Sequence, residues 1–248
     1  SSLTITVINT NSTAPASVSA TSNPVCAGNS TTLLIVGGSL GSGANWQWYS
    51  SGCGGTLIAT GVPISVSPGS TTTYYVRAEG TCNTTACVSI TVTVNSLSTD
   101  PTSASTSANP ICEGNSTSLS LVVGSLGTGA TWQWYSGTCG GAFVGTGASI
   151  FATPSFTTTY FVRAEGTCNT TNCVSVTVTV NTNSTPPTGI TASVNPTCPS
   201  QATTLTVVGG SLGSGAIWQW YSASCGGAFV GSGTSVPVSP ATTRTYFS

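Results

Sequence analysis

The sequence has almost no charge. Its 248 residues include no histidine, lysine or methionine, and the net charge is −1. A nucleic-acid-binding protein needs a basic face, so we expect no nucleic-acid partner. Without histidine the many serines lack the base that usually activates a nucleophile, and general acid–base catalysis needs groups of tuned pKa. The four acidic residues are scattered, so we expect no enzyme, no cofactor and no metal: Glu79, Asp100, Glu113 and Glu165.

Long apolar runs are also missing. No segment approaches the roughly 18 consecutive apolar residues of a membrane-spanning helix, so we expect no membrane insertion. The chain has ten cysteines, and without histidine they favour disulfides over zinc. Disulfides persist in oxidising compartments, which predicts a secreted protein, extracellular or at the cell surface. A surface with so little charge lacks electrostatic repulsion, so we expect self-association, glycans, or both.

A repeat of 86 residues organises the chain. The cysteines recur with this spacing in four series: Cys26, Cys112 and Cys198; Cys53, Cys139 and Cys225; Cys82 and Cys168; Cys87 and Cys173. The tetrapeptide that begins at Trp46 recurs at Trp132 and Trp218. Fixed self-similarity indicates a tandem array. A period of 86 residues suits a whole β-sandwich domain, which has about 100 residues.

Each repeat is expected to consist of short β-strands. Between Val88 and Val94, apolar residues alternate with serine and threonine, the period of a half-buried strand, and no window has helical periodicity. Turns rich in glycine and proline separate the runs. The expected strands of the first repeat are Ser17–Ser22, Thr31–Val36, Asn45–Ser50, Leu57–Thr60, Ile64–Ser67, Thr73–Glu79 and Cys87–Val94. This spacing of strands and turns predicts an all-β fold of tandem immunoglobulin-like β-sandwiches.

The repeats predict four segments. Residues 1–8 are expected to be the last strand of a preceding repeat or a donor strand, residues 9–94 and 95–180 two complete repeats, and residues 181–248 a repeat without its last strand. In one interpretation the sequence is a window on a longer array. In the other, the strand at Leu3–Ile8 completes the third repeat of a neighbouring chain, as strand addition does in pili. Both interpretations lead to a filament or stalk.

Several motifs resemble those of a known group of repeats. They are Cys26-Ala27-Gly28, the pair Trp46 and Trp48, Cys53-Gly54-Gly55, and Thr71–Gly80 followed by Cys82. The chain resembles the cysteine-containing immunoglobulin-like, or fibronectin-III-like, tandem repeats of secreted Bacteroidetes surface proteins over essentially its whole length. The resemblance implies an extracellular or cell-surface role. The sequence departs from antibody domains because no cysteine lies inside the second expected strand.

All ten cysteines are expected to form disulfides. The third repeat carries only Cys198 and Cys225. If every cysteine pairs within its own repeat, these two must bond to each other, and the equivalent cysteines of the other repeats must do the same. The resulting pairs are Cys26–Cys53, Cys112–Cys139, Cys198–Cys225, Cys82–Cys87 and Cys168–Cys173.

Side chains of one central strand are candidates for recognition. Trp46 and Trp48 share one face and would form either a sugar-stacking platform or part of the core, and the core is favoured because this strand usually carries a buried tryptophan. Gln47 and Tyr49 point the other way, so an exposed row of Tyr49 residues is the better contact surface. Arg77 and Glu79 share a strand face and predict an exposed ion pair.

Two further patterns bear on function. The glycine-rich segment at residues 37–43 resembles a phosphate-binding loop only superficially, because such a loop needs a lysine and a following helix; it predicts an ordinary loop. Six sequons are candidate N-glycosylation sites: Asn11, Asn29, Asn83, Asn115, Asn169 and Asn183.

These observations favour a structural subunit or stalk of an extracellular filament or surface adhesin, assembled head-to-tail by strand complementation. The alternatives are a carbohydrate-binding or adhesive recognition module and an accessory array of a larger secreted protein. The partners expected are other copies of the chain and glycans.

Overall fold

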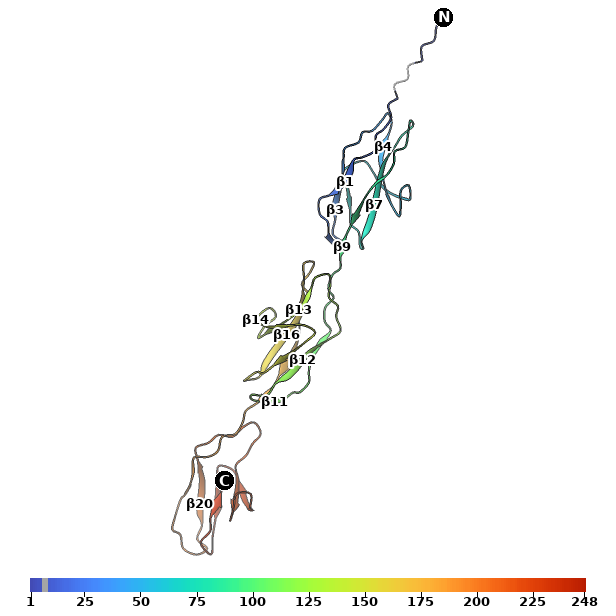
Figure 1. The fold of residues 1–248 in the computed structure, drawn as a ribbon. Helices are drawn as coiled ribbons and strands as arrows, with labels where there is room; N and C mark the ends of the chain where they lie inside the picture. The colour runs from blue at the N-terminus through green and yellow to red at the C-terminus, as the bar shows by residue number, and fades with distance from the viewer. Residues whose placement is uncertain (6–8) are drawn as a thin grey trace. The chain divides into compact units, whose positions relative to one another are not determined.

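The computed structural model describes residues 1–5 and 9–248. This part of the chain forms β-strands, and it contains no helix that could span a membrane. The chain divides into two compact units. The first unit comprises Ser1–Thr102, Val122–Gln133 and Val162–Val174, and the second comprises Ser103–Leu121, Trp134–Phe161 and Ser175–Ser248. Figure 1 shows the strands of the three repeats along the chain.

Two sheets form the first repeat. One has the strand order β1-β3-β6 and the other the order β5-β4-β7-β8, and neighbouring strands pair antiparallel. All seven strands that the sequence predicts are present. Their bounds are β1 Ser17–Ala20, β3 Thr31–Val36, β4 Asn45–Ser50, β5 Thr56–Thr60, β6 Ile64–Val66, β7 Thr72–Glu79 and β8 Val88–Val92.

Alternating side chains build the core between these sheets. In β7 every second residue is buried, namely Tyr74, Val76 and Ala78, because successive side chains of a strand point to opposite faces. Trp48 from β4 and Leu33 from β3 pack in the same cluster and are fully buried. Each large apolar side chain buried in this way contributes about 1.5–3 kcal/mol to stability.

A short parallel pairing, which the sequence did not predict, closes one end of the first repeat. β2 (Val25–Cys26) pairs with β9 (Val94–Asn95). The Val25 N–H donates to the carbonyl of Thr93 at 3.0 Å, and the Ala27 N–H donates to the carbonyl of Asn95 at 2.9 Å. Because β9 begins the connector to the second repeat, this connector is hydrogen-bonded to the segment that carries Cys26.

The second repeat has the same strands 86 residues later. Its sheets have the orders β10-β12-β15 and β14-β13-β16-β17, and β11 pairs with β18. The bounds are β10 Ser103–Thr106, β11 Ile111–Cys112, β12 Thr117–Val122, β13 Thr131–Ser136, β14 Ala142–Thr146, β15 Ser149–Ala152, β16 Thr158–Glu165, β17 Val174–Val178 and β18 Val180–Asn181. The repetition of the sequence therefore becomes a repetition of structure.

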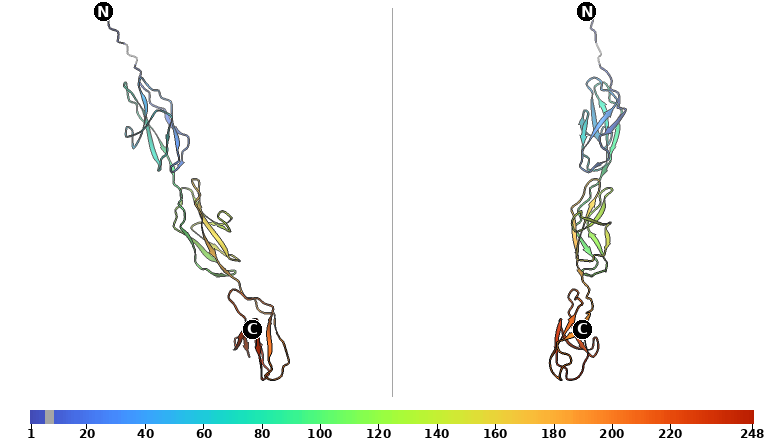
Figure 2. Two further views of the ribbon diagram at one scale, coloured as in Figure 1. Left: turned by 180° about the vertical axis from the view of Figure 1, so that it is seen from behind. Right: turned by 90° about the vertical axis from the view of Figure 1, so that its left-hand side faces the viewer.

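The third repeat has one sheet with the order β19-β20-β23 and another with the order β22-β21-β24. The bounds are β19 Gly189–Ala192, β20 Thr203–Val208, β21 Gln219–Ser222, β22 Ala228–Ser232, β23 Ser235–Val238 and β24 Tyr246–Phe247. The carboxyl end of the chain lies within this repeat in every view of Figures 1 and 2. Among the described strands, none pairs with β24 on the side that β8 occupies beside β7.

The strand predicted at Leu3–Ile8 extends over residues 6–8, which lie outside the described residues. Residues 3–5 form no strand. The side chains of Leu3 and Ile5 are 87% and 80% exposed, so this segment presents apolar side chains to solvent.

Candidate functional site

A disulfide joins cysteines of two different repeats. Cys26, at the end of β2, is bonded to Cys168, in the hairpin between β16 and β17. Their Cα atoms are 5.5 Å apart, within the usual range for disulfides, and both residues lie in the first compact unit. The Cys168 sulfur lies 4.0 Å from the carbonyl oxygen of Asn95 in β9. The bond therefore forms beside the connector that leads from the first repeat into the second.

A second disulfide lies within the first repeat. It joins Cys53, in the turn after β4, to Cys87, which precedes β8, with Cα atoms 5.9 Å apart. It ties the turn between β4 and β5 to the start of the edge strand β8. The equivalent residues of the second repeat, Cys139 and Cys173, are also disulfide-bonded.

The five disulfides that the sequence predicts do not form. Disulfide formation needs Cβ atoms about 3.5–4.5 Å apart, and the fold places Cys26 beside the connector and Cys53 beside Cys87. Four exposed cysteines have no disulfide partner in the described chain: Cys82, Cys112, Cys198 and Cys225. The pairs that do not form are Cys26–Cys53, Cys112–Cys139, Cys198–Cys225, Cys82–Cys87 and Cys168–Cys173.

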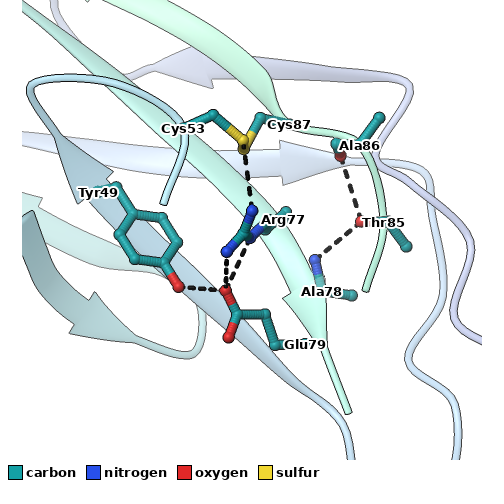
Figure 3. Close-up of polar contacts among 8 residues, drawn as sticks. All are labelled: Tyr49, Cys53, Arg77, Ala78, Glu79, Thr85, Ala86 and Cys87. Atoms are coloured by element: carbon teal, nitrogen blue, oxygen red, sulfur yellow. Dashed lines mark hydrogen bonds and ion pairs between the residues drawn. A yellow bond between two sulfur atoms is a disulfide. The ribbon is translucent and has the colours of Figure 1, made fainter. Parts of the chain in front are cut away.

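A polar cluster lies beside the Cys53–Cys87 disulfide (Figure 3). The Nε atom of Arg77 donates to Oε1 of Glu79 at 2.7 Å, and its Nη2 atom lies 2.7 Å from the same oxygen. The hydroxyl of Tyr49 donates to Glu79 as well. The Arg77 guanidinium lies 5.2 Å from the centre of the Tyr49 ring, and its Nη1 atom lies 3.7 Å from the Cys53 sulfur. Arg77 therefore connects β7 to the turn between β4 and β5 that carries Cys53.

These contacts shift the ionisation of the cluster. The hydrogen bond from Tyr49, and then that from Arg77, lowers the pKa of Glu79 from its ordinary value. Burial, and then the hydrogen bond to Glu79, raises the pKa of Tyr49. The hydrogen bond to Glu79 raises the pKa of Arg77. Each group is thus held in the charge state it already has at neutral pH, whereas a general acid or base needs a pKa near the working pH; the cluster is structural.

The exposed Tyr49 row predicted from the sequence is wrong. The ion pair of Arg77 and Glu79 is confirmed, but it is half-buried rather than exposed. Tyr49 is 7% exposed and Tyr135 is 9% exposed. Tyr49 is covered because the Arg77 guanidinium lies over its ring and its hydroxyl bonds to Glu79. In the second repeat, Arg163 and Glu165 form the same ion pair at 2.7 Å.

The tryptophans of the two complete repeats belong to the core, as predicted, and in the third repeat Trp220 does so. Trp46 and Trp48 are both buried. The indole N–H of Trp48 donates to the carbonyl oxygen of Gly61 at 2.9 Å. The equivalent bonds, from Trp134 to Gly147 and from Trp220 to Gly233, have the same length. Each repeat therefore uses one buried tryptophan to fix the turn after β5, β14 or β22, and this ring presents no platform for a sugar.

The glycine-rich segment is a loop between β3 and β4, as predicted. A Cβ atom at Gly41 would lie 2.0 Å from the carbonyl oxygen of Thr10. The Gly41 N–H donates to the hydroxyl of Ser12 at 2.9 Å. The loop therefore packs closely against the segment that enters the repeat.

The sequons lie in two different environments. The side chains at Asn11, Asn29, Asn115 and Asn183 are exposed. Asn83 is half-buried, and its amide bonds to both backbone groups of Ser12. Asn169 has the same two bonds with Ser98. The two half-buried asparagines hold the hairpin against the entering segment, and glycosylation stays a prediction.

The third repeat contains a cavity of about 390 Å³ at the open side of β24. Its lining includes Ala192, Leu205 and Tyr246. In the first repeat the equivalent residues are Ala20, Leu33 and Tyr74, and they pack in a core cluster with Val92 of β8. The cavity thus lies where a strand equivalent to β8 would bury its side chains.

Across residues 1–5 and 9–248, no group of three His, Cys, Asp or Glu side chains could hold a metal ion. The chemistry that the structure offers is that of paired and unpaired thiols, a structural ion pair and an open sheet edge.

Comparisons with known proteins agree with this architecture. The model of the family described as "Ig-like domain CHU_C associated" matches residues 13–95 and 99–181. Domains of this type are typical of extracellular surface proteins, and tandem immunoglobulin-like domains are generally non-enzymatic structural or adhesion modules. No curated protein matches the sequence.

Solved structures of low sequence identity resemble the chain, and the first of them shows that the fold is shared. Three immunoglobulin domains of titin, in a glutamate-to-alanine variant, are 11% identical with a TM-score of 0.55, over 91% of this chain and 88% of that chain. An I-band fragment of titin is 11% identical with a TM-score of 0.48, over 83% and 79%. Murine CEACAM1b is 14% identical with a TM-score of 0.38, over 66% and 98%. The chain belongs to the family of Ig-like domains described as CHU_C associated, with two tandem copies matched.

Proposed function

We propose that the chain is a structural subunit of an extracellular filament or stalk, and that the amino-terminal segment of one copy adds as a strand to the third repeat of another. The observation that carries the proposal is the open edge of β24 above a cavity of about 390 Å³. An open sheet edge offers a row of unpaired backbone groups to an extended segment.

The residues around the cavity support an apolar strand as the occupant. Leu205 and Tyr246 line it, and their equivalents Leu33 and Tyr74 are buried in the first repeat. There, β8 pairs with β7 and contributes the fully buried Val92 to the core. A strand that enters the third repeat would likewise bury apolar side chains on one face only.

The amino-terminal segment has the pattern that such a strand needs. Leu3, Ile5 and Val7 alternate with Thr4 and Thr6, so one face of the segment is apolar and the other carries hydroxyls, as in β8. A strand that turns Leu3 and Ile5 toward the cavity lies one residue out of the register that the 86-residue period gives, in which Ile5 is equivalent to the exposed Thr91. Leu3 and Ile5 are among the most exposed large apolar side chains of the chain. Their transfer into the cavity would remove apolar surface from water, which favours association at about 25 cal/mol per Å².

Strand addition between copies would be head-to-tail, because the donor segment and the acceptor edge lie in different repeats, and a head-to-tail contact that does not close into a ring generates a polymer. The low surface charge supports association, since little electrostatic repulsion opposes it. A recognition role based on the tryptophans has no such support, because those of the complete repeats are buried.

Electron microscopy of the purified chain tests the proposal. We expect filaments from the unchanged chain and from Thr4→Asp, whose substitution falls on the hydroxyl face of the donor segment. Ile5→Asp would place a charge in the cavity and should leave single subunits. Single subunits from the unchanged chain, or filaments unaffected by Ile5→Asp, would contradict strand addition.

A further inference from the structure

The Cys26–Cys168 disulfide gives the chain a second, much shorter covalent path. Along the backbone the two residues are 142 positions apart, a segment that spans about 470–510 Å when it is fully extended. Through the bond their Cα atoms stay 5.5 Å apart. Tension that reaches the two cysteines therefore follows the bond, and the backbone between them stays slack.

The segment that the bond bypasses contains most of both complete repeats. From the first repeat it includes β3 to β9, and from the second it includes β10 to β16. The fully buried side chains of Trp48 and Trp134 lie within it. The strands of these repeats that remain on the path of tension are β1 and β2, up to the bond, and β17 and β18, beyond it.

Without the bond, tension that reaches β2 would act next on its short pairing with β9. This parallel pairing has two residue pairs. The Val25 N–H donates to the carbonyl of Thr93 at 3.0 Å, and the Ala27 N–H donates to the carbonyl of Asn95 at 2.9 Å. Because a hydrogen bond contributes only about 0.5–1.5 kcal/mol net, this pairing is weak. The disulfide thus lies where the unravelling of the first repeat would otherwise continue.

Hydrogen-bonded contacts precede the bond on each side. On the amino-terminal side, the amide of Asn23 donates to the Thr91 carbonyl at 2.8 Å and accepts from the Thr93 N–H at 2.9 Å. On the carboxyl-terminal side, the amide of Asn169 makes two bonds of 2.9 Å with the backbone of Ser98. Tension from either end must break these contacts before it reaches the disulfide.

We propose that the Cys26–Cys168 disulfide is a mechanical stop. Under tension the chain can be drawn out from either end as far as these two cysteines, and the segment between them cannot be pulled out. The bond passes the tension from the first repeat directly to the second. This function belongs to a single chain and does not depend on strand addition between copies.

Stretching of single molecules tests the proposal. DNA handles on the two ends of the full chain are held in optical tweezers, and the contour length of the force-unfolded chain is measured before and after addition of dithiothreitol. One dithiothreitol thiolate attacks a sulfur of the bond, and its second thiol then closes a cyclic disulfide. Dithiothreitol is oxidised and each protein disulfide is reduced to two thiols. We expect a gain of about 470–510 Å, from the 142 bypassed positions.

The Cys53–Cys87 disulfide supplies a matched control, because both of its cysteines lie inside the bypassed segment. The variant Cys53→Ser/Cys87→Ser should have the same contour length as the unchanged chain before dithiothreitol is added, and the same total gain afterwards. The variant Cys26→Ser/Cys168→Ser removes the stop. It should exceed the unchanged chain in contour length before dithiothreitol is added.

Two results would overturn the proposal. One is an unchanged chain whose length does not increase with dithiothreitol, and this comparison stands even where Cys26→Ser/Cys168→Ser does not fold. The other is a longer contour for Cys53→Ser/Cys87→Ser before reduction, since tension would then pass through the first repeat. Because single molecules are stretched, either result leaves strand addition between copies untouched.

Discussion

Asn83 bonds to both backbone groups of Ser12, a residue 71 positions earlier in the chain. Its Oδ1 accepts from the Ser12 N–H at 2.8 Å, and its Nδ2 donates to the Ser12 carbonyl at 3.0 Å. Asn83→Ala leaves both groups without these partners, and an unsatisfied buried group costs about 1–3 kcal/mol. We expect a loss of this size in the free energy of unfolding of the first repeat, measured by chemical denaturation.

Asn29→Ala is the matched control, because Asn29 is an exposed sequon asparagine in the same repeat. Its substitution should change the free energy of unfolding by no more than about 0.5 kcal/mol. Equal effects of the two substitutions would show that the bonds to Ser12 do not stabilise the fold.

Removal of the whole Trp48 ring should lower the free energy of unfolding more than removal of its indole N–H alone. Trp48→Phe keeps an aromatic ring but removes the 2.9 Å bond to Gly61, and we expect a loss of about 1–3 kcal/mol from the unpaired carbonyl. Trp48→Ala should cost about 3–5 kcal/mol because it also leaves a cavity. Denaturation monitored by circular dichroism measures both. If Trp48→Phe matched the unchanged chain, the hydrogen bond would have no role in stability.

The Cys53–Cys87 disulfide should stabilise the first repeat because it reduces the conformational entropy of the unfolded chain. The bond closes a sequence separation of 34 residues, for which loop-closure entropy predicts up to about 4 kcal/mol. The variant Cys53→Ser/Cys87→Ser should therefore lower the melting temperature of the first repeat in calorimetry. The variant Cys139→Ser/Cys173→Ser provides the control, because it should act on the second repeat instead. An unchanged melting profile in both variants would exclude this role.

The strands could be predicted because their signals are local and are repeated. Alternation of apolar and hydroxyl side chains between Val88 and Val94 indicates β8 directly, and the 86-residue period transfers that assignment to the second repeat. The burial of Trp48 likewise follows from its place on a central strand.

Features that depend on other parts of the chain could not be predicted. The partner of Cys26 lies 142 residues away in another repeat. The spacing of the cysteines along the sequence does not indicate that the connector between the repeats brings Cys26 and Cys168 together. Tyr49 points away from the core, but Arg77 and the hydrogen bond to Glu79 cover it. The period did contain one unused signal: Cys82 and Cys168 are equivalent, so a partner in another repeat was as compatible with the spacing as a partner in their own.

The stability of the first repeat should fall in acid because of Glu79. Its pKa in the folded protein is below the ordinary value of 4.5, chiefly because the Tyr49 hydroxyl and Arg77 donate to its carboxylate. A group whose pKa is lower in the folded state than in the unfolded state stabilises the fold above its unfolded pKa, and this stabilisation is lost as the pH falls through the folded pKa. We expect the contribution of Glu79 to be constant from pH 7 to about pH 5 and to decline below about pH 4.

Chemical denaturation of the unchanged chain and of Glu79→Gln across this pH range isolates that contribution. Glu79→Gln removes the titrating group, so the difference in unfolding free energy between the two proteins should be largest near neutral pH and shrink in acid. Glu113→Gln is the control for removing one negative charge because Glu113 is exposed, and at neutral pH it should change the free energy of unfolding by no more than about 0.5 kcal/mol. A difference for Glu79→Gln that grows as the pH falls has the opposite sign, and it would mean that the carboxylate destabilises the fold.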